Sequence, residues 1–346
     1  MQLYSLDPLT DSRWSDFVTS HPRASAFHQV NWLNALATTY GYRPVVLTSA
    51  PPGAGLRDGV VFCEVRSWIT GNRLVSLPFS DHAEPLLNDA GISHDIARWI
   101  DEESKARKWK YIETRPISAP LQAEHPMVLS QSFWLHTLDL ALPTDRLFGN
   151  LHRSCMQRRI RHAERQKLVY ERSSSDSLLD EFYELLLMTR RRFQLLPQPR
   201  SWFRNLMACM GSNAEIRLLR KDNRAIAAIL TLRHRGTVVY KYGCSDEKFH
   251  RLAGMPYLFW KLIEESKAEN AEHIDFGRSD TDNHGLIRFK DRLGTTRRRL
   301  NYFRTAEFAS EQALVTRDLP ASRVLFSALP GALSSVAGSL VYRHIG

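Results

Sequence analysis

The sequence predicts an α/β protein of two similar halves with mixed, largely antiparallel sheets. Its length of 346 residues suits two domains of about 150 residues each better than a single one. The apolar content of 43% and the charged content of 24% are ordinary for a globular protein. A repeated order of helical and strand-like segments is the third observation, and it favours a duplicated fold over two unrelated domains.

The repeat is clearest in two helical segments, IDEESKA at 100–106 and LIEESKA at 262–268. Each is followed by a short strand pattern, which reaches Ile112-Glu113 in the first half and Ile274-Asp275 in the second. Glu, Ser, Lys and Ala are common in helices, so the shared letters alone are weak evidence. The shared succession of helix and strand makes an internal duplication the simplest account.

The similarity extends upstream of these helices. LVSLPFSDH at 74–82 and VVYKYGCSD at 238–246 alternate apolar and polar residues and stop at Ser-Asp, so we expect a strand in each. WLNAL at 32–36 and WFRNL at 202–206 open helical segments of like pattern. In the second half the patterns predict a helix at 256–270 and strands at 215–221, 225–234, 237–245, 272–277 and 297–305.

We therefore expect three parts of the chain: an N-terminal half at 1–147, a C-terminal half at 148–306 and a tail at 307–346. The tail has no charged residue from Val324 to Tyr342. This stretch predicts an amphipathic helix, which either packs on the body or lies on a membrane. Its apolar positions at helical spacing are Leu325, Leu329, Leu333, Val336 and Leu340.

Composition limits the partners and the compartment. A net charge of +10 and a pI near 9.6 favour an anionic partner: nucleic acid, an anionic membrane surface or a phosphate-bearing substrate. The four cysteines show no paired spacing, which indicates a reducing cytoplasm. The histidines show no ligand spacing, so we expect no metal. The N-terminus lacks the basic region and apolar core of a signal peptide.

A candidate donor site follows the strand that ends at 245. The turn HRLAGMP carries Arg251, Gly254 and Pro256 ahead of a helix expected to begin near Tyr257. Helix N-termini have unpaired N–H groups and a partial positive charge, and both bind anions. The order R-x-x-G-x-P resembles the pyrophosphate loop of the GCN5-related N-acetyltransferase (GNAT) fold. We therefore expect Arg251, Gly254, Met255, Pro256 and Tyr257 to bind an activated donor, whereas the first half lacks such a turn and is expected to serve as an acceptor platform.

Clustered arginines predict further phosphate contacts. Arg158, Arg161 and Arg165 share one face of a predicted helix, and the run is otherwise typical of a solvated surface. The second basic run extends from Leu286 to Arg304 and includes Arg288, and Arg278 precedes it on the preceding strand end. A phosphate-rich ligand such as tRNA, coenzyme A or a pyrophosphate-linked lipid carrier suits these residues. At a strand end of the first half, Asp81 and His82 are candidates for contacts with the acceptor.

Several features of the chain, taken together, resemble the Fem-type transferases. They are the tandem halves and the segments FHQVNW at 27–32, RRIRHAERQ at 158–166, YKYGCSD at 240–246 and DFGRSDTDNHGLIRFKDRLG at 275–294. The likeness covers roughly residues 20–305 and extends to Fem-related acyltransferases of exopolysaccharide and exosortase systems. Fem-type enzymes transfer an amino acid from aminoacyl-tRNA to an amine of the cell-wall precursor.

The resemblance implies roles for single residues. Lys290 matches the family lysine that stabilises the transition state of acyl transfer, and Phe289 stands beside it. Tyr242 matches a tyrosine of the reaction channel. Asp275, in the Asp-Phe-Gly-Arg strand end, is a candidate for the group that keeps the acceptor amine unprotonated. The chain departs from the family pattern F-x-Q-x-x-W-x-x-x-K, because Leu36 occupies the position of the phosphate-binding lysine.

We therefore predict a cytoplasmic acyl or aminoacyl transferase that makes an amide on a cell-envelope glycan or a lipid-linked precursor. The donor is expected to be aminoacyl-tRNA or acyl-CoA, with no tightly bound cofactor and with contact to the inner membrane surface as an option. One alternative is an acyl-CoA-dependent N-acyltransferase of exopolysaccharide synthesis. A second alternative is a basic protein that binds membrane or RNA without catalysis. The DFG triplet at 275–277 is no kinase signature, because the chain has no HRD segment.

Overall fold

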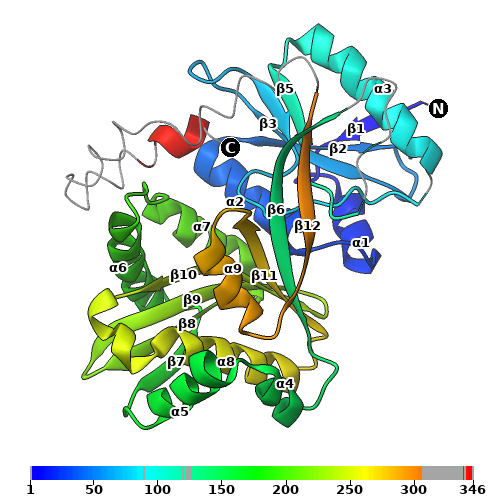
Figure 1. The fold of residues 1–346 in the computed structure, drawn as a ribbon. Helices are drawn as coiled ribbons and strands as arrows, with labels where there is room; N and C mark the ends of the chain where they lie inside the picture. The colour runs from blue at the N-terminus through cyan, green and yellow to red at the C-terminus, as the bar shows by residue number, and fades with distance from the viewer. Residues whose placement is uncertain are drawn as a thin grey trace. The chain divides into compact units, whose positions relative to one another are not determined.

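The computed structural model describes residues 2–88, 90–118, 121, 127–305, 338 and 340–344. They divide into two compact units, each of which is an α/β layer structure (Figure 1). The described residues of unit 1 lie within 2–132, 300–305 and 340–344, and those of unit 2 are 133–299 and 338.

Unit 1 is a sheet flanked by helices. Its strands are hydrogen-bonded in the order β1-β2-β3-β4-β5, and all pairs are antiparallel except β4 with β5. Helix α3 packs its apolar side, including Ile96 and Ile100, against Phe62, Leu74 and Ile112 of the strands. In chain order the elements are β1 (Tyr4–Leu6), α1 (Ser12–Ser20), η1 (Ala26–His28), α2 (Val30–Tyr40), β2 (Arg43–Thr48), β3 (Val60–Val65), β4 (Arg73–Val75), α3 (Ala90–Arg107) and β5 (Tyr111–Thr114).

Unit 2 repeats this plan. Its strands follow the order β7-β8-β9-β10-β11, and only β10 and β11 are parallel. Helices α6 and α7 cover one face of the sheet, and α4, α5 and α8 cover the other (Figure 1). The elements are α4 (Thr144–Asn150), η2 (Arg153–Gln157), α5 (Arg158–Glu164), β7 (Val169–Ser173), α6 (Asp176–Arg192), α7 (Arg200–Met210), η3 (Gly211–Asn213), β8 (Ala214–Lys221), β9 (Arg224–His234), β10 (Thr237–Ser245), η4 (Glu247–Leu252), α8 (Gly254–Ala268), β11 (His273–Asp280) and α9 (His284–Asp291).

The two units therefore share one order of elements: a strand, two α-helices, three antiparallel strands, a helix and a parallel strand. Each is completed by a strand from the other half of the sequence. Strand β6 (Val128–Asp139) follows β5 along the chain but pairs with β11, and β12 (Thr296–Arg304) follows α9 but pairs with β5. The compact units thus differ from the continuous halves 1–147 and 148–306 by this exchange of strands.

Three expected elements change their limits. The strand expected at 74–82 is wrong beyond Val75, because Leu77 and Phe79 have positive φ angles of 54° and 61° that no strand accommodates. Strand β11 does not stop at 277 but continues to Asp280, since it resumes pairing with β6 after Gly277. Helix α8 begins at Gly254, before the expected start.

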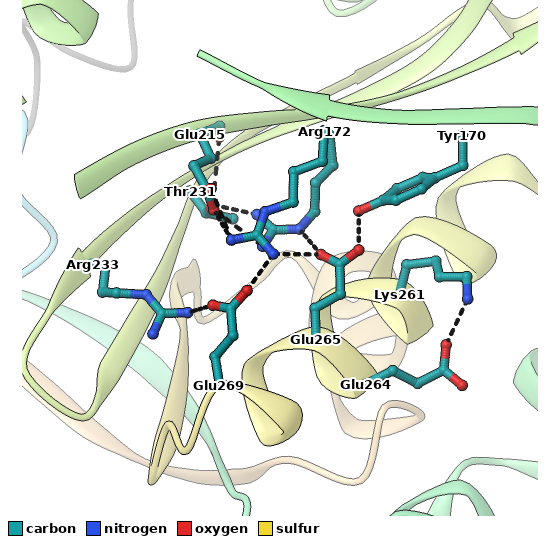
Figure 2. A network of polar contacts seen from close by, with 10 residues as sticks. Tyr170, Arg172, Glu215, Thr231, Arg233, Lys261, Glu264, Glu265 and Glu269 are labelled. Carbon is teal, nitrogen blue, oxygen red and sulfur yellow. Dashed lines mark hydrogen bonds and ion pairs between the residues drawn. The ribbon is translucent and has the colours of Figure 1, made fainter. Parts of the chain in front are cut away.

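A polar network fastens α8 to the sheet (Figure 2). Arg217 of β8 is fully buried, and its guanidinium donates to the Glu265 carboxylate at 2.8 Å and to Thr231 Oγ1 at 2.7 Å. Tyr170 of β7 donates to the other oxygen of Glu265 at 2.6 Å. Burial and this carboxylate raise the pKa of the Tyr170 phenol, so it remains a donor. The network holds the helix whose first turn carries the candidate donor site.

The amphipathic helix expected from Val324 to Tyr342 lies almost wholly outside the described residues. The described residues 340–344 are helical and pack on unit 1. The Tyr342 carbonyl accepts a hydrogen bond from Tyr42 Oη at 2.7 Å, and the Tyr342 ring meets Phe79 edge to face. Within the described residues, no helix combines the length and the apolarity needed to cross a bilayer.

Candidate functional site

Strands β10 and β11 separate within unit 2. They pair only from Thr237–Val239 with His273–Asp275, and beyond this point β10 stays with β9 while β11 stays with β6. Four aromatic rings occupy the region where the strands part. Phe259 of α8 lies at the centre, with ring centroids 4.8 Å from Tyr240, 5.6 Å from Phe276 and 5.5 Å from Phe289. The half-buried Phe289 is thereby connected to α8.

Lys290 is buried beside this aromatic group, with 3% of its surface exposed. Its ammonium donates to the backbone carbonyls of Gly277 at 3.1 Å and Arg278 at 2.8 Å. Asp275 accepts a hydrogen bond from the Gly277 N–H at 2.7 Å, and Gly277 has a φ angle of +70°. The carboxylate therefore stabilises the backbone bend that presents carbonyl oxygens to the lysine. Lys290, Asp275, Phe289 and Arg278 lie together at this end of β11.

His136 of β6, which is not among the residues expected from the sequence, lies in the same region. Its side chain is fully buried, and Nδ1 is 3.4 Å from Thr295 Oγ1 and 3.6 Å from Asp291 Oδ1. Thr295 Oγ1 in turn donates to the Lys290 carbonyl at 3.0 Å. His136 Nε2 is buried with no hydrogen-bond partner among the described residues. No sequence motif marks this histidine, because β6 reaches β11 only through the exchange of strands.

His136 predicts a pH dependence of stability. Burial, with the Lys290 charge next in weight, lowers the pKa of His136 from 6.5 to about 4. Between these values the unfolded chain binds a proton that the folded protein does not, so acidification favours unfolding. We expect this residue to lower the free energy of unfolding by about 2 kcal/mol between pH 7 and pH 5. Urea unfolding at both pH values measures it.

A matched substitution isolates this contribution. His136→Asn removes the titrating group, so the difference in unfolding free energy between pH 7 and pH 5 decreases by that amount. His273→Asn, at an exposed position at the start of β11, leaves the difference unchanged. An equal pH response of the parent and the His136 variant contradicts the assignment.

The expected donor residues lie at the start of α8. Ala253 precedes the helix in a left-handed conformation, and the helix has no side-chain cap and no acidic residue in its first turn. Arg251 is exposed, Met255 and Tyr257 are half-buried, and Pro256 is buried within the first turn, where proline is tolerated. The result is a helix N-terminus that favours anions.

Packing of α8 on the sheet explains why position 254 is a glycine. A Cβ atom at this position would lie 3.2 Å from Ala227 Cβ, so glycine allows α8 to approach β9 closely. Arg159, which is not among the residues expected from the sequence, contacts the segment just before α8 by donating to the His250 carbonyl at 2.7 Å. Arg192 lies 3.3 Å from the His250 ring nitrogen. Positive charge therefore collects near the first turn of α8.

Tyr242 lies on the other face of the sheet. The pairing of β10 with β9 shifts between Tyr240 and Tyr242, which leaves Lys241 as a bulge. Residues two apart in a regular strand share a face, but here the bulge turns them apart: Tyr240 meets α8, whereas Tyr242 packs on α7. Tyr242 Oη accepts from Trp202 Nε1 at 2.9 Å and donates to Gln198 Oε1 at 2.8 Å.

The arginines expected to bind phosphate lie on or next to three elements of unit 2. Arg158, Arg161 and Arg165 are exposed on and just after α5, which packs against α8, and Arg161 covers the Phe148 ring. On the other element pair, Arg278 of β11 is half-buried with its guanidinium 4.1 Å from the Phe133 ring centroid, and Arg288 of α9 is exposed.

The candidate acceptor residues Asp81 and His82 belong to unit 1. The Asp81 carbonyl accepts a hydrogen bond from Tyr302 Oη at 2.6 Å. His82 is buried and meets the Phe27 ring edge to face at 5.2 Å. No group of three His, Cys, Asp or Glu side chains suited to a metal occurs in the part of the chain that the structure describes.

Comparisons with known proteins agree with this architecture. The sequence model of the acetyltransferase (GNAT) domain matches residues 151–291, a range that contains both the α8 turn and Lys290. The crystal structure of FemX superposes with a TM-score of 0.68 at 15% identity, covering 88% of this chain and 97% of FemX. No curated protein sequence matches the chain significantly.

Two further structures share the fold. One is the C-terminal domain of a lysylphosphatidylglycerol synthetase from Agrobacterium fabrum, with a TM-score of 0.56, 13% identity and coverage of 86% of this chain and 93% of that one. The other is a tandem GNAT protein from the clavulanic acid biosynthesis pathway, with a TM-score of 0.51, 14% identity and coverage of 88% and 98%. The predicted fold class is confirmed, and so is the likeness to a Fem-type protein at the level of the fold.

Proposed function

We propose that the protein is an acyl or aminoacyl transferase that forms an amide bond on an amine of a cell-envelope glycan or lipid-linked precursor. The observation that supports this most is the combination, within one GNAT-type domain, of an anion-favouring helix start and a buried lysine. The aromatic group links these two features, because Phe259 belongs to the helix that begins at Gly254 and its ring centroid lies 5.5 Å from that of Phe289, the neighbour of Lys290.

The chemistry is the aminolysis of an activated carbonyl. The lone pair of the acceptor nitrogen attacks the donor's carbonyl carbon, and the carbonyl electron pair moves onto oxygen. The intermediate then collapses to the amide as the bond to the thiol or ribose oxygen breaks, and the leaving group receives the proton lost by the amine. A buried ammonium group stabilises the oxyanion far better than a solvated one. We assign this role to Lys290.

The first turn of α8, with Arg251, is assigned to the phosphates of the donor. Its helix N-terminus and the nearby arginines supply the positive potential. A GNAT-type domain favours an acyl-CoA donor, and the basic surface of α5 with Arg158, Arg161 and Arg165 is also compatible with tRNA. Asp275 is assigned to hold the Gly277 bend, and Tyr242 to support the sheet behind it.

The experiment combines donor binding with product detection. The protein is screened by thermal shift against acyl-CoAs and aminoacyl-tRNAs, and active donors are then incubated with amine-bearing glycans and lipid-linked precursors. Mass spectrometry of the acceptor detects the new amide. We expect one donor class to raise the melting temperature and to yield product. Binding of RNA or lipid without any amide product would instead indicate a non-catalytic basic protein.

Arg251 provides a direct test of the donor assignment. Arg251→Ala removes an exposed cation near the start of α8, and we expect KM for the donor to rise about tenfold with kcat nearly unchanged, because the lost contact is made equally in the ground and transition states. Arg235→Ala, at an exposed position in the β9–β10 turn, serves as the control and leaves KM unchanged. An unchanged KM in the Arg251 variant contradicts the assignment.

A further inference from the structure

The connection between β3 and β4 in unit 1 exposes large apolar side chains. Trp68 is 88% exposed and Ile69 is 59% exposed, whereas Trp14, Trp32 and Trp202 are completely buried. Two adjacent large apolar side chains at the end of a hairpin are unfavourable in water, because neither removes apolar surface from solvent. We refer to Trp68 and Ile69 as the apolar tip.

The backbone of the apolar tip is ordered by local hydrogen bonds. Ser67 Oγ accepts from the N–H groups of Ile69 at 3.2 Å and Thr70 at 2.9 Å, and the Ser67 carbonyl accepts from the Gly71 N–H at 2.9 Å. Gly71 has a φ angle of +84°, which glycine adopts without strain. The turn therefore holds the two apolar side chains outward instead of letting them fold onto the body.

The end of the chain is attached to the same turn. Ser67 Oγ lies 2.9 Å from His344 Nδ1, and Thr70 Oγ1 donates to the His344 carbonyl at 2.7 Å. The His344 ring meets Trp68 edge to face at 5.9 Å. Leu340, one helical turn before His344, is itself 64% exposed. Exposed apolar side chains from two distant parts of the sequence therefore belong to one locality of unit 1.

Basic residues flank the apolar tip. Arg66 precedes it, Arg343 is exposed beside His344, and Lys110 packs its side chain against Gly71. The acidic residue nearest along the strand is Glu64, which pairs with Arg66 at 2.9 Å. Cations around exposed apolar groups are complementary to a partner whose outer layer is negatively charged and whose interior is apolar.

We propose that the apolar tip docks unit 1 on the surface of a lipid bilayer that contains anionic phospholipid. Tryptophan is enriched at the level of the headgroups, and an aliphatic neighbour extends into the acyl region. The flanking Arg66, Lys110 and Arg343 attract anionic headgroups. This contact is shallow and reversible, because the apolar tip consists of two side chains. It goes beyond the proposed transferase activity and does not depend on it.

Co-sedimentation of the full chain with vesicles of phosphatidylcholine, with and without phosphatidylglycerol, tests the proposal. We expect binding to the anionic vesicles, weakened by salt. The double variant Trp68→Ser, Ile69→Ser lowers the partition coefficient at least about tenfold, whereas Trp68→Phe retains most of the binding. The control pair Phe193→Ser, Leu195→Ser changes exposed apolar residues of unit 2, 60% and 46% exposed, and leaves binding unchanged.

Three other outcomes would contradict membrane docking by the apolar tip. Absence of vesicle binding by the parent, or equal binding by the tip variant, overturns the proposal. In the third outcome neither protein binds vesicles, and the parent self-associates while the tip variant is monomeric. The apolar tip would then bind a second copy of the chain, which also overturns the proposal. Turnover on a soluble acceptor is expected to be the same in parent and tip variant, so failure of this proposal is distinguishable from failure of the transferase assignment.

Discussion

Replacement of Lys290 by methionine is expected to reduce kcat by at least about 100-fold, because removal of one oxyanion donor from a buried site has an effect of this size. Methionine preserves most of the side-chain volume and removes the charge together with the hydrogen bonds to Gly277 and Arg278. Steady-state amide formation with the donor identified by thermal shift measures the change. KM for the donor should change little, since the charge acts in the transition state.

Loss of stability must be separated from loss of catalysis. Two carbonyls lose their partner in the Lys290 variant, and this destabilises the fold by about 1–3 kcal/mol. Lys267→Met is the matched control, because Lys267 also donates to two backbone carbonyls, those of Leu140 at 2.7 Å and Ala141 at 3.3 Å. We expect the control to be destabilised and yet fully active. A Lys290 variant that folds and turns over within twofold of the parent would exclude the lysine from the mechanism.

Substitution of Glu265 by alanine should have the largest effect on stability, about 3 kcal/mol or more. The reason is that Arg217 is completely buried and Glu265 is its closest carboxylate, at 2.8 Å, so the variant leaves a poorly compensated charge in the core. The hydroxyl of Tyr170 loses its acceptor as well. Urea unfolding at neutral pH, followed by circular dichroism, measures the decrease in the free energy of unfolding.

Glu264, the neighbour of Glu265 on α8, provides the comparison for the Glu265 variant (Figure 2). Glu264 pairs with Lys261 at 3.0 Å on the same helix, but both side chains are about one-third exposed. Glu264→Ala makes the same change of helix propensity and removes only a solvated ion pair, so we expect a loss of about 0–1 kcal/mol. If the two variants are destabilised equally, the buried arginine does not depend on Glu265.

Much of the fold was accessible from the sequence because its signals are local. The alternation at 215–221, 225–234 and 237–245 predicted β8, β9 and β10 almost to the residue. The helical repeat at 100–106 and 262–268 located the ends of α3 and α8. The strand pattern at 74–82 failed, because backbone conformations with positive φ at Leu77 and Phe79 leave no periodic signal in the letters.

The candidate site was accessible only in part. The turn around Gly254 could be found from the sequence, because a glycine and a proline ahead of a helix form a local pattern. The burial of Lys290 could not, since its two acceptors lie more than ten residues away on another element. His136 was missed for the same reason.

By itself, the sequence determined the duplicated order of helices and strands, the basic character of the chain and the glycine-proline turn at 254–256 ahead of a helix, because each depends on residues near one another in the chain. The tertiary structure alone decided the exchange of β6 and β12, the opposite facing of Tyr240 and Tyr242, and the burial of Lys290 beside His136. Strand partners and burial result from contacts between distant segments, where packing and hydrogen bonding outweigh local preference.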